Sequence, residues 1–284
     1  MSQPSIRPVT VSRLRLNVCE WGTPGQPLLV LLHGLASTLH MFDLIAPQLA
    51  SDFHVIAYDQ RGHGLSDKPV TGYDFETVAA DLDHLLDALG LTGQPFVLAG
   101  HSWGAYTALY YAATRSASVH KTILIDGGLR PMTDYFSRVE EMAPPQHHNW
   151  ALEEVKRMIR EDWLGAAFRP ELEQLVLSIY DTSNPSAVKP HLSLKNHMEI
   201  ASALWNFRAV DYYTRIQSPL LVINAVNTGN TPDPRLQAYV AAVEQQVEHC
   251  KAIWMPDTIH DIPWQRPGQL VEIMRAFMTQ DLTP

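Results

Sequence analysis

Short apolar runs alternate with amphipathic segments along most of this chain. Leu14, Leu16 and Val18 alternate with polar neighbours, and this period of two residues predicts a half-buried β-strand. Solid apolar runs follow, each of which predicts a parallel strand buried on both faces. These runs cover residues 28–32, 54–58, 96–99, 122–125, 220–223 and 252–255.

Helical patterns lie between the apolar runs. From Val78 to Leu89 the apolar residues fall on one helical face and aspartates on the others, and Gly90 then ends the helix. The segment 267–278 begins with proline, which suits the first helical turn, and predicts a C-terminal helix. Strands that alternate with helices predict βαβ units, and therefore an α/β fold with a doubly wound, mostly parallel sheet.

This alternation breaks between about Leu129 and Ala209. The stretch has no clean strand pattern, and its prolines and large aromatic side chains predict short helices joined by loops. Because the strand pattern resumes at Pro219, we interpret the stretch as a helical cap inserted into the core, with a separate helical domain as the alternative. The predicted parts are core residues 1–128, cap residues 129–210 and core residues 211–284.

A candidate nucleophile follows the run 96–99. Residues 100–104 read Gly-His-Ser-Trp-Gly, and the segment after them has a helical pattern. Gly-x-Ser-x-Gly between a strand and a helix is the nucleophile elbow, in which the glycines let neighbouring backbone approach closely. The serine hydroxyl then projects above the sheet near the positive end of the helix. This context predicts Ser102 as a nucleophile.

A serine hydroxyl is a weak nucleophile at neutral pH and needs a base. The chain has 13 histidines, so context must select among them. His260 lies in the loop after the last apolar run and before the last helix. Such loops lie at the carboxyl ends of parallel strands, where the nucleophile also lies. We therefore predict His260 as the general base.

An acyl-transfer site also needs donors for the developing oxyanion. In a fold with a nucleophile elbow, one backbone N–H belongs to the residue after the nucleophile, which is Trp103. The other belongs to the loop after the strand 28–32, where the order His33, Gly34, Leu35 makes Leu35 the candidate.

Taken together, these motifs resemble the α/β-hydrolase superfamily. The resemblance rests on LLHGL at 31–35, DQRGHGLSDKP at 59–69, the elbow, and His260 with Pro267. It is closest to the branch that includes esterases, meta-cleavage-product hydrolases, epoxide hydrolases and haloalkane dehalogenases, and it covers residues 14–125 and 219–277. The resemblance implies a cap between strands six and seven, in agreement with the insertion.

The acid of the triad is the point at which this chain departs from the family pattern. In most relatives the acid follows strand seven, but here no carboxylate follows the run 220–223 before Asp233. Some relatives carry the acid after strand six, and Asp126 occupies that position. Both choices keep the order Ser, Asp, His. We favour Asp126, with Asp233 as the alternative and a site without a true acid as a third option.

A serine nucleophile argues against haloalkane dehalogenases and epoxide hydrolases, because the resemblance implies a carboxylate nucleophile in those enzymes. It fits hydrolysis of a small to medium ester, thioester or lactone through an acyl-enzyme, and so predicts a carboxylesterase-like enzyme. A carbon–carbon bond hydrolase of the meta-cleavage-product type is the nearest alternative. Cofactor-free haloperoxidases, lyases and ligand-binding receptors on similar folds are the others.

Composition narrows the range of partners. The net charge is −9, which argues against nucleic acid and against an anionic membrane surface. No apolar run approaches the roughly 20 residues of a membrane span, and residues 1–10 lack a signal-peptide pattern. We therefore expect a cytoplasmic protein that acts on a small molecule. The sequence shows no dinucleotide fingerprint and no metal-ligand spacing, so we expect no cofactor or metal. Oligomeric state is not predicted.

Overall fold

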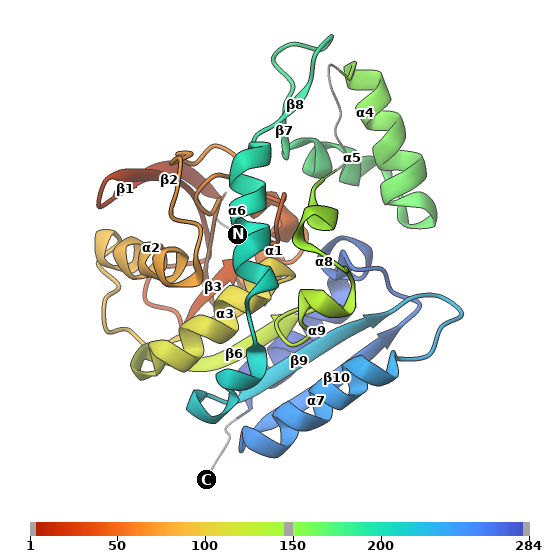
Figure 1. Ribbon diagram of the computed structural model, residues 1–284. Coiled ribbons are helices and arrows are strands. Elements are labelled where there is room, and N and C mark those ends of the chain that lie inside the picture. Colours follow the sequence, from red (N-terminus) through yellow and green to blue (C-terminus); the bar gives the residue numbers. More distant parts are fainter. Residues whose placement is uncertain (1–3, 145–149, 281–284) are drawn as a thin grey trace.

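One mixed sheet with helices on both faces organises the structure (Figure 1). The computed structural model describes residues 4–144 and 150–280. The strands of the sheet are β1 (Ser5–Val11), β2 (Leu14–Trp21), β3 (Leu28–Leu32), β4 (His54–Tyr58), β5 (Phe96–His101), β6 (Val119–Ile125), β9 (Leu220–Val226) and β10 (Cys250–Pro256). Their spatial order is β1-β2-β4-β3-β5-β6-β9-β10. The pairs β1–β2 and β2–β4 are antiparallel, and the other pairs are parallel.

Two apolar cores lie on the two faces of this sheet. Successive residues of β3 alternate between them, with Leu28, Val30 and Leu32 in one core and Leu29 and Leu31 in the other. The helices that pack against the first core are α2 (Phe75–Ala88), α3 (Trp103–Thr114) and α7 (Pro234–Gln246). Those that pack against the second are α1 (Ala46–Leu49), α8 (Ile262–Gln265) and α9 (Pro267–Thr279).

This architecture confirms the predicted doubly wound α/β fold. All six solid apolar runs are strands of the sheet, and the helices predicted in the core are α2, α3 and α9. The prediction for β10 was wrong in one respect, because this strand forms the edge of the sheet and is mostly half-buried. The first strand, β1, was not predicted. Asn17 of β2 is only 6% exposed, because its side chain donates a hydrogen bond to Asp59 (2.9 Å) inside the fold.

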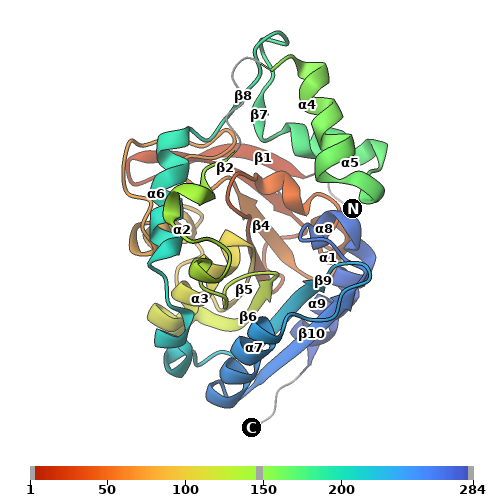
Figure 2. The same ribbon diagram turned by 45° about the vertical axis from the view of Figure 1, so that its right-hand side comes forward.

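Residues between β6 and β9 leave the sheet, since these two strands pair directly. The segment contains α4 (Leu152–Met158), α5 (Pro170–Leu177) and α6 (Leu194–Trp205), together with the paired strands β7 (Tyr180–Asp181) and β8 (Lys189–Pro190). The strands β7 and β8 have two residues each, too few to give a strand pattern in the sequence, and they were not predicted. In Figures 1 and 2, α4, α5 and the β7–β8 ribbon project together from one end of the molecule. The boundaries at residues 128 and 210 stay a prediction.

Candidate active site

The predicted nucleophile lies at a sharp turn between β5 and α3. Ser102 has φ 55° and ψ −120°, a conformation that costs a non-glycine residue about 1–3 kcal/mol. The flanking glycines allow this turn, because a Cβ on Gly100 would lie 2.0 Å from the Gly104 carbonyl oxygen. A Cβ on Gly104 would lie 2.1 Å from the carbonyl oxygen of Leu32. The packing of β3, β5 and α3 therefore maintains the conformation of Ser102.

The structure brings Asp126 and His260 together. Asp126 follows the end of β6, and its Oδ2 lies 2.5 Å from His260 Nδ1. Its other oxygen, Oδ1, accepts a hydrogen bond from the Ala225 amide of β9 (2.8 Å). His260 lies in the loop between β10 and α8. Because both carboxylate oxygens are engaged, Asp126 fixes the orientation of the imidazole ring.

Asp233, the alternative acid, has a different environment. Its side chain caps the N-terminus of α7 by accepting a hydrogen bond from the Arg235 amide (2.8 Å). It also accepts a hydrogen bond from Arg130 (2.9 Å). These contacts give Asp233 a structural role, and the geometry favours Asp126 as the acid.

The charge state of His260 depends on Asp126. Desolvation of the imidazole opposes its charged form, yet the hydrogen bond and the negative charge of Asp126 outweigh this effect and raise the pKa of His260 to about 9. Half of the side chain (52%) is exposed to the cleft, so the ring is open to a substrate. A general base acts only when it is neutral.

If His260 is the base, kcat/KM for a neutral ester should rise with pH through neutrality and level off near pH 9. The reason is that protonated His260 cannot accept the Ser102 proton, and protonation is lost as the pH rises through the pKa of about 9. Asp126→Asn removes the hydrogen-bonded charge that does most to raise this pKa and leaves the smaller effect of Asp261, so the acidic limb of its residual activity should move to lower pH. A pH–rate profile of both proteins measures this shift. An unchanged limb in the variant would argue against the Asp126–His260 pair.

His101, the residue before the nucleophile, supports the histidine loop. Its Nε2 donates a hydrogen bond to the backbone carbonyl of His260 (2.9 Å), and the two rings lie 4.8 Å apart. Burial, followed by the nearby His260, lowers the pKa of His101 to about 4, so the ring is neutral near pH 7. The partner of His101 lies 159 residues away in the sequence, so no local pattern indicates this contact.

Two further neutral histidines support the loop that carries Leu35. His63 Nε2 accepts a hydrogen bond from the Ala36 amide (3.2 Å), and His33 Nδ1 donates one to the Gly34 carbonyl (2.8 Å). Burial is the main cause that lowers the pKa of His63 to about 3 and that of His33 to about 4. Both rings therefore stay neutral, and each keeps one acceptor nitrogen: His63 Nε2 for the Ala36 amide, and His33 Nε2 for the Gln60 amide (2.9 Å). The loop next to the nucleophile is thus rigidly held.

Gly34→Ala should lower kcat/KM by at least about 100-fold. The new Cβ would lie 2.9 Å from Ser102 Cβ, and a displacement of the nucleophile by on the order of 1 Å has a cost of this size. Gly268→Ala in α9 is the matched control, because a Cβ there meets no atom within 4 Å. Steady-state kinetics and thermal melts of both variants make the comparison. Equal activity in the two variants would contradict the proposed close contact at Ser102.

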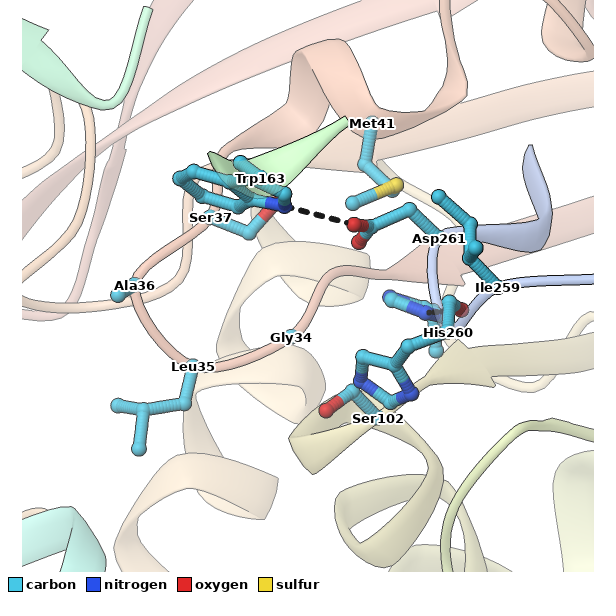
Figure 3. Close-up of a pocket in the computed structure, with 11 residues that line it drawn as sticks. Gly34, Leu35, Ala36, Ser37, Met41, Ser102, Trp163, Ile259, His260 and Asp261 are labelled. Carbon is cyan, nitrogen blue, oxygen red and sulfur yellow. Dashed lines mark hydrogen bonds between the residues drawn. The ribbon is translucent and has the colours of Figure 1, made fainter. Parts of the chain in front are cut away.

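A cavity of about 270 Å³ lies above the nucleophile. Ser102, His260 and Leu35 line it, together with Met41, Trp163 and Ile259 (Figure 3). The structure records no hydrogen bond between Ser102 and His260 among the residues it describes. Such contacts are often long in the absence of substrate and shorten in the reacting complex. A second cavity of about 360 Å³ is also lined by Ser102 and His260, and it extends toward Arg130.

One contact at this site was not predicted. The indole Nε1 of Trp163 donates a hydrogen bond to Asp261 Oδ2 (2.8 Å), as the dashed line in Figure 3 shows. Trp163 belongs to the segment between β6 and β9, whereas Asp261 directly follows His260. The two residues are 98 positions apart, and no sequence pattern links them.

Two further features bear on possible partners. Within residues 4–144 and 150–280, no three histidine, cysteine, aspartate or glutamate side chains gather in a way that suits a metal ion. No helix in the same residues is both long and apolar enough to cross a bilayer.

The fold and the elbow correspond to a known family. A family model described as the alpha/beta hydrolase fold matches residues 27–254. The chain therefore belongs to the α/β-hydrolase fold family.

Individual relatives are named as hydrolases. The chain is 40% identical over 120 residues to 2-(acetamidomethylene)succinate hydrolase of Mesorhizobium japonicum, covering 42% of each chain. It is 40% identical over 108 residues to epoxide hydrolase A of Mycobacterium tuberculosis, covering 37% of this chain and 33% of that one. The chain thus spans less than half the length of these curated relatives. A solved E-2-(acetamidomethylene)succinate hydrolase has the same fold, with a TM-score of 0.83 and 23% identity over 98% of this chain and 100% of that one.

Proposed function

We propose that this protein is a serine hydrolase that cleaves ester-like substrates through an acyl-enzyme. His260 takes the proton of Ser102 as the hydroxyl attacks the substrate carbonyl, and Asp126 holds the imidazole and stabilises its charged form. The Leu35 and Trp103 amides donate hydrogen bonds to the oxyanion. His260 then protonates the leaving group. Water, activated by the same histidine, releases the acid and restores Ser102.

The contact between Asp126 Oδ2 and His260 Nδ1 (2.5 Å) carries this proposal. It orients the histidine beside the cavity that Ser102 lines. The Asp126 carboxylate is mostly buried and holds the histidine in this orientation, and the serine lies on a strained turn beside it. Nucleophilic acyl transfer requires this arrangement.

The surroundings of Ser102 favour an uncharged acyl group. The cavity of about 270 Å³ is lined by no lysine or arginine among the described residues. Arg130 lines the cavity on the other side of Ser102, but Asp233 and Asp134 lie 2.9 Å and 3.4 Å from its guanidinium. A succinate derivative, such as the one in the name of the Mesorhizobium japonicum relative, would bring carboxylates to these two cavities. Among the described residues that line them, no lysine or arginine is without an acidic partner. A neutral ester, thioester or lactone avoids that cost.

A series of p-nitrophenyl esters of increasing acyl length tests this function. The same assay should include a carboxylate-bearing ester and a carbon–carbon hydrolase substrate as parallel arms. The proposal expects turnover of the neutral esters, which Ser102→Ala abolishes, and much weaker turnover of the charged substrates. Turnover of the carbon–carbon substrate alone would replace the proposal with the alternative reaction.

A further inference from the structure

Trp163 lies at the boundary between two cavities. One is the cavity of about 270 Å³ above Ser102, and the other has a volume of about 430 Å³. Trp163 lines both, as do Ala36 and Ser37 of the loop after β3. Because the side chains of Ala36 and Ser37 are small, the Trp163 indole is the large side chain at this boundary. In the view of Figure 3, Trp163 and Ser37 appear on the side of the cavity opposite Ser102.

We propose that Trp163 determines acyl-chain specificity by closing the cavity above Ser102 against the larger one. The inference rests on the proposed function, since it concerns the acyl group bound at Ser102. An acyl group bound in the cavity of about 270 Å³ must fit that volume, and chains that exceed it bind poorly there. Removing the indole joins the two cavities and admits longer chains.

Two contacts fix the indole in this position. Its Nε1 donates to Asp261 Oδ2 (2.8 Å), and Asp261 directly follows His260 in the chain. Its ring also lies 6.3 Å from the ring of Trp264, which is buried in α8. These contacts fix the position of the Trp163 indole relative to the loop that carries His260. That position therefore does not depend only on the fold of the segment between β6 and β9.

The larger cavity has the chemistry of a site for a hydrocarbon chain. Apolar side chains supply much of its wall, among them Met158, Ile179, Leu192 and Leu194. Burial lowers the pKa of His63, which also lines it, to about 3, so that ring is neutral near pH 7, and burial lowers the pKa of His197 as well. The charged side chain in the lining is Lys189, which is exposed to solvent. Burying additional methylene groups against such a wall favours binding of longer acyl chains.

The test measures kcat/KM across a p-nitrophenyl ester series from acetate to laurate. Trp163→Ala should raise the ratio of long-chain to short-chain kcat/KM by about 10-fold or more, while Trp163→Phe, which keeps a large ring, should leave the profile close to that of the unmodified protein. Trp163→Leu provides a second variant that retains apolar contact with Trp264. It should shift the profile in the same direction by a smaller factor.

Met158→Trp combined with Trp163→Ala tests whether the longer acyl chains enter the larger cavity. Met158 lines only the larger of the two cavities, so a bulky side chain there should reverse the gain and leave short-chain activity intact. A gain that persists in this double variant, or an unchanged profile in both Trp163→Ala and Trp163→Leu, would overturn the inference. Failure of the proposed function itself is distinguishable, because the unmodified protein would then neither hydrolyse acetate esters nor react with a fluorophosphonate at Ser102.

Discussion

Replacing Ser102 by alanine should lower kcat for a neutral ester by about a million-fold. Removing the nucleophile of a triad has an effect of this size, and the activity that remains comes from the oxyanion donors and substrate binding. Because Ser102 adopts a positive φ of 55°, alanine inherits the same strain and should not rearrange the turn. Single-turnover and steady-state assays with p-nitrophenyl acetate measure the loss.

Ser202→Ala is the matched control for this variant. Ser202 is exposed on α6, and alanine suits a helix, so neither activity nor stability should fall. Far-UV circular dichroism of both variants shows whether the fold is retained. If Ser102→Ala keeps more than a small fraction of the activity while folded, another residue supplies the nucleophile and the proposal fails.

Asp126→Asn should lower kcat by about ten-thousand-fold with little change in the fold. In a triad, asparagine leaves the histidine in place but favours the wrong tautomer, and the stabilising charge is lost. Asp233→Asn is the comparison, because asparagine can still cap α7 and keep that helix N-terminus in place. We expect this second variant to retain activity within a few-fold. Parallel kinetic measurements on the two proteins assign the acid.

The two aspartates can be told apart by this comparison even if both variants are weakened. A large loss in Asp233→Asn with a small loss in Asp126→Asn would reverse the assignment. Full activity in both variants would remove the aspartate from the mechanism altogether.

Local patterns predicted the parts of the site that depend on local structure. The strand, turn and helix around Ser102 are encoded within about twenty consecutive residues, so the sequence identified the elbow directly. His260 could be selected because its loop lies between the last strand and the last helices. Asp126 required a comparison of two strand ends, since the family's usual position after the strand 220–226 carries no carboxylate.

Contacts between distant segments could not be predicted in the same way. The Trp163 indole meets Asp261 only because the segment between β6 and β9 folds over the histidine loop. A tryptophan among other aromatic residues gives no signal for such a partner. The burial of Asn17 was missed for a related reason, because its hydrogen bond to Asp59 is made across the fold. Sequence periodicity indicates which face of a strand or helix is apolar. It does not indicate which polar side chains form hydrogen bonds in the interior of the protein.

The most direct test of the account is covalent labelling of the folded protein with a fluorophosphonate, followed by peptide mass spectrometry. The account predicts one rapid adduct on the peptide that contains Ser102, absent in Ser102→Ala and much slower in Asp126→Asn. An unlabelled folded protein, or an adduct on a different serine, would contradict the claim that Ser102 is an activated nucleophile.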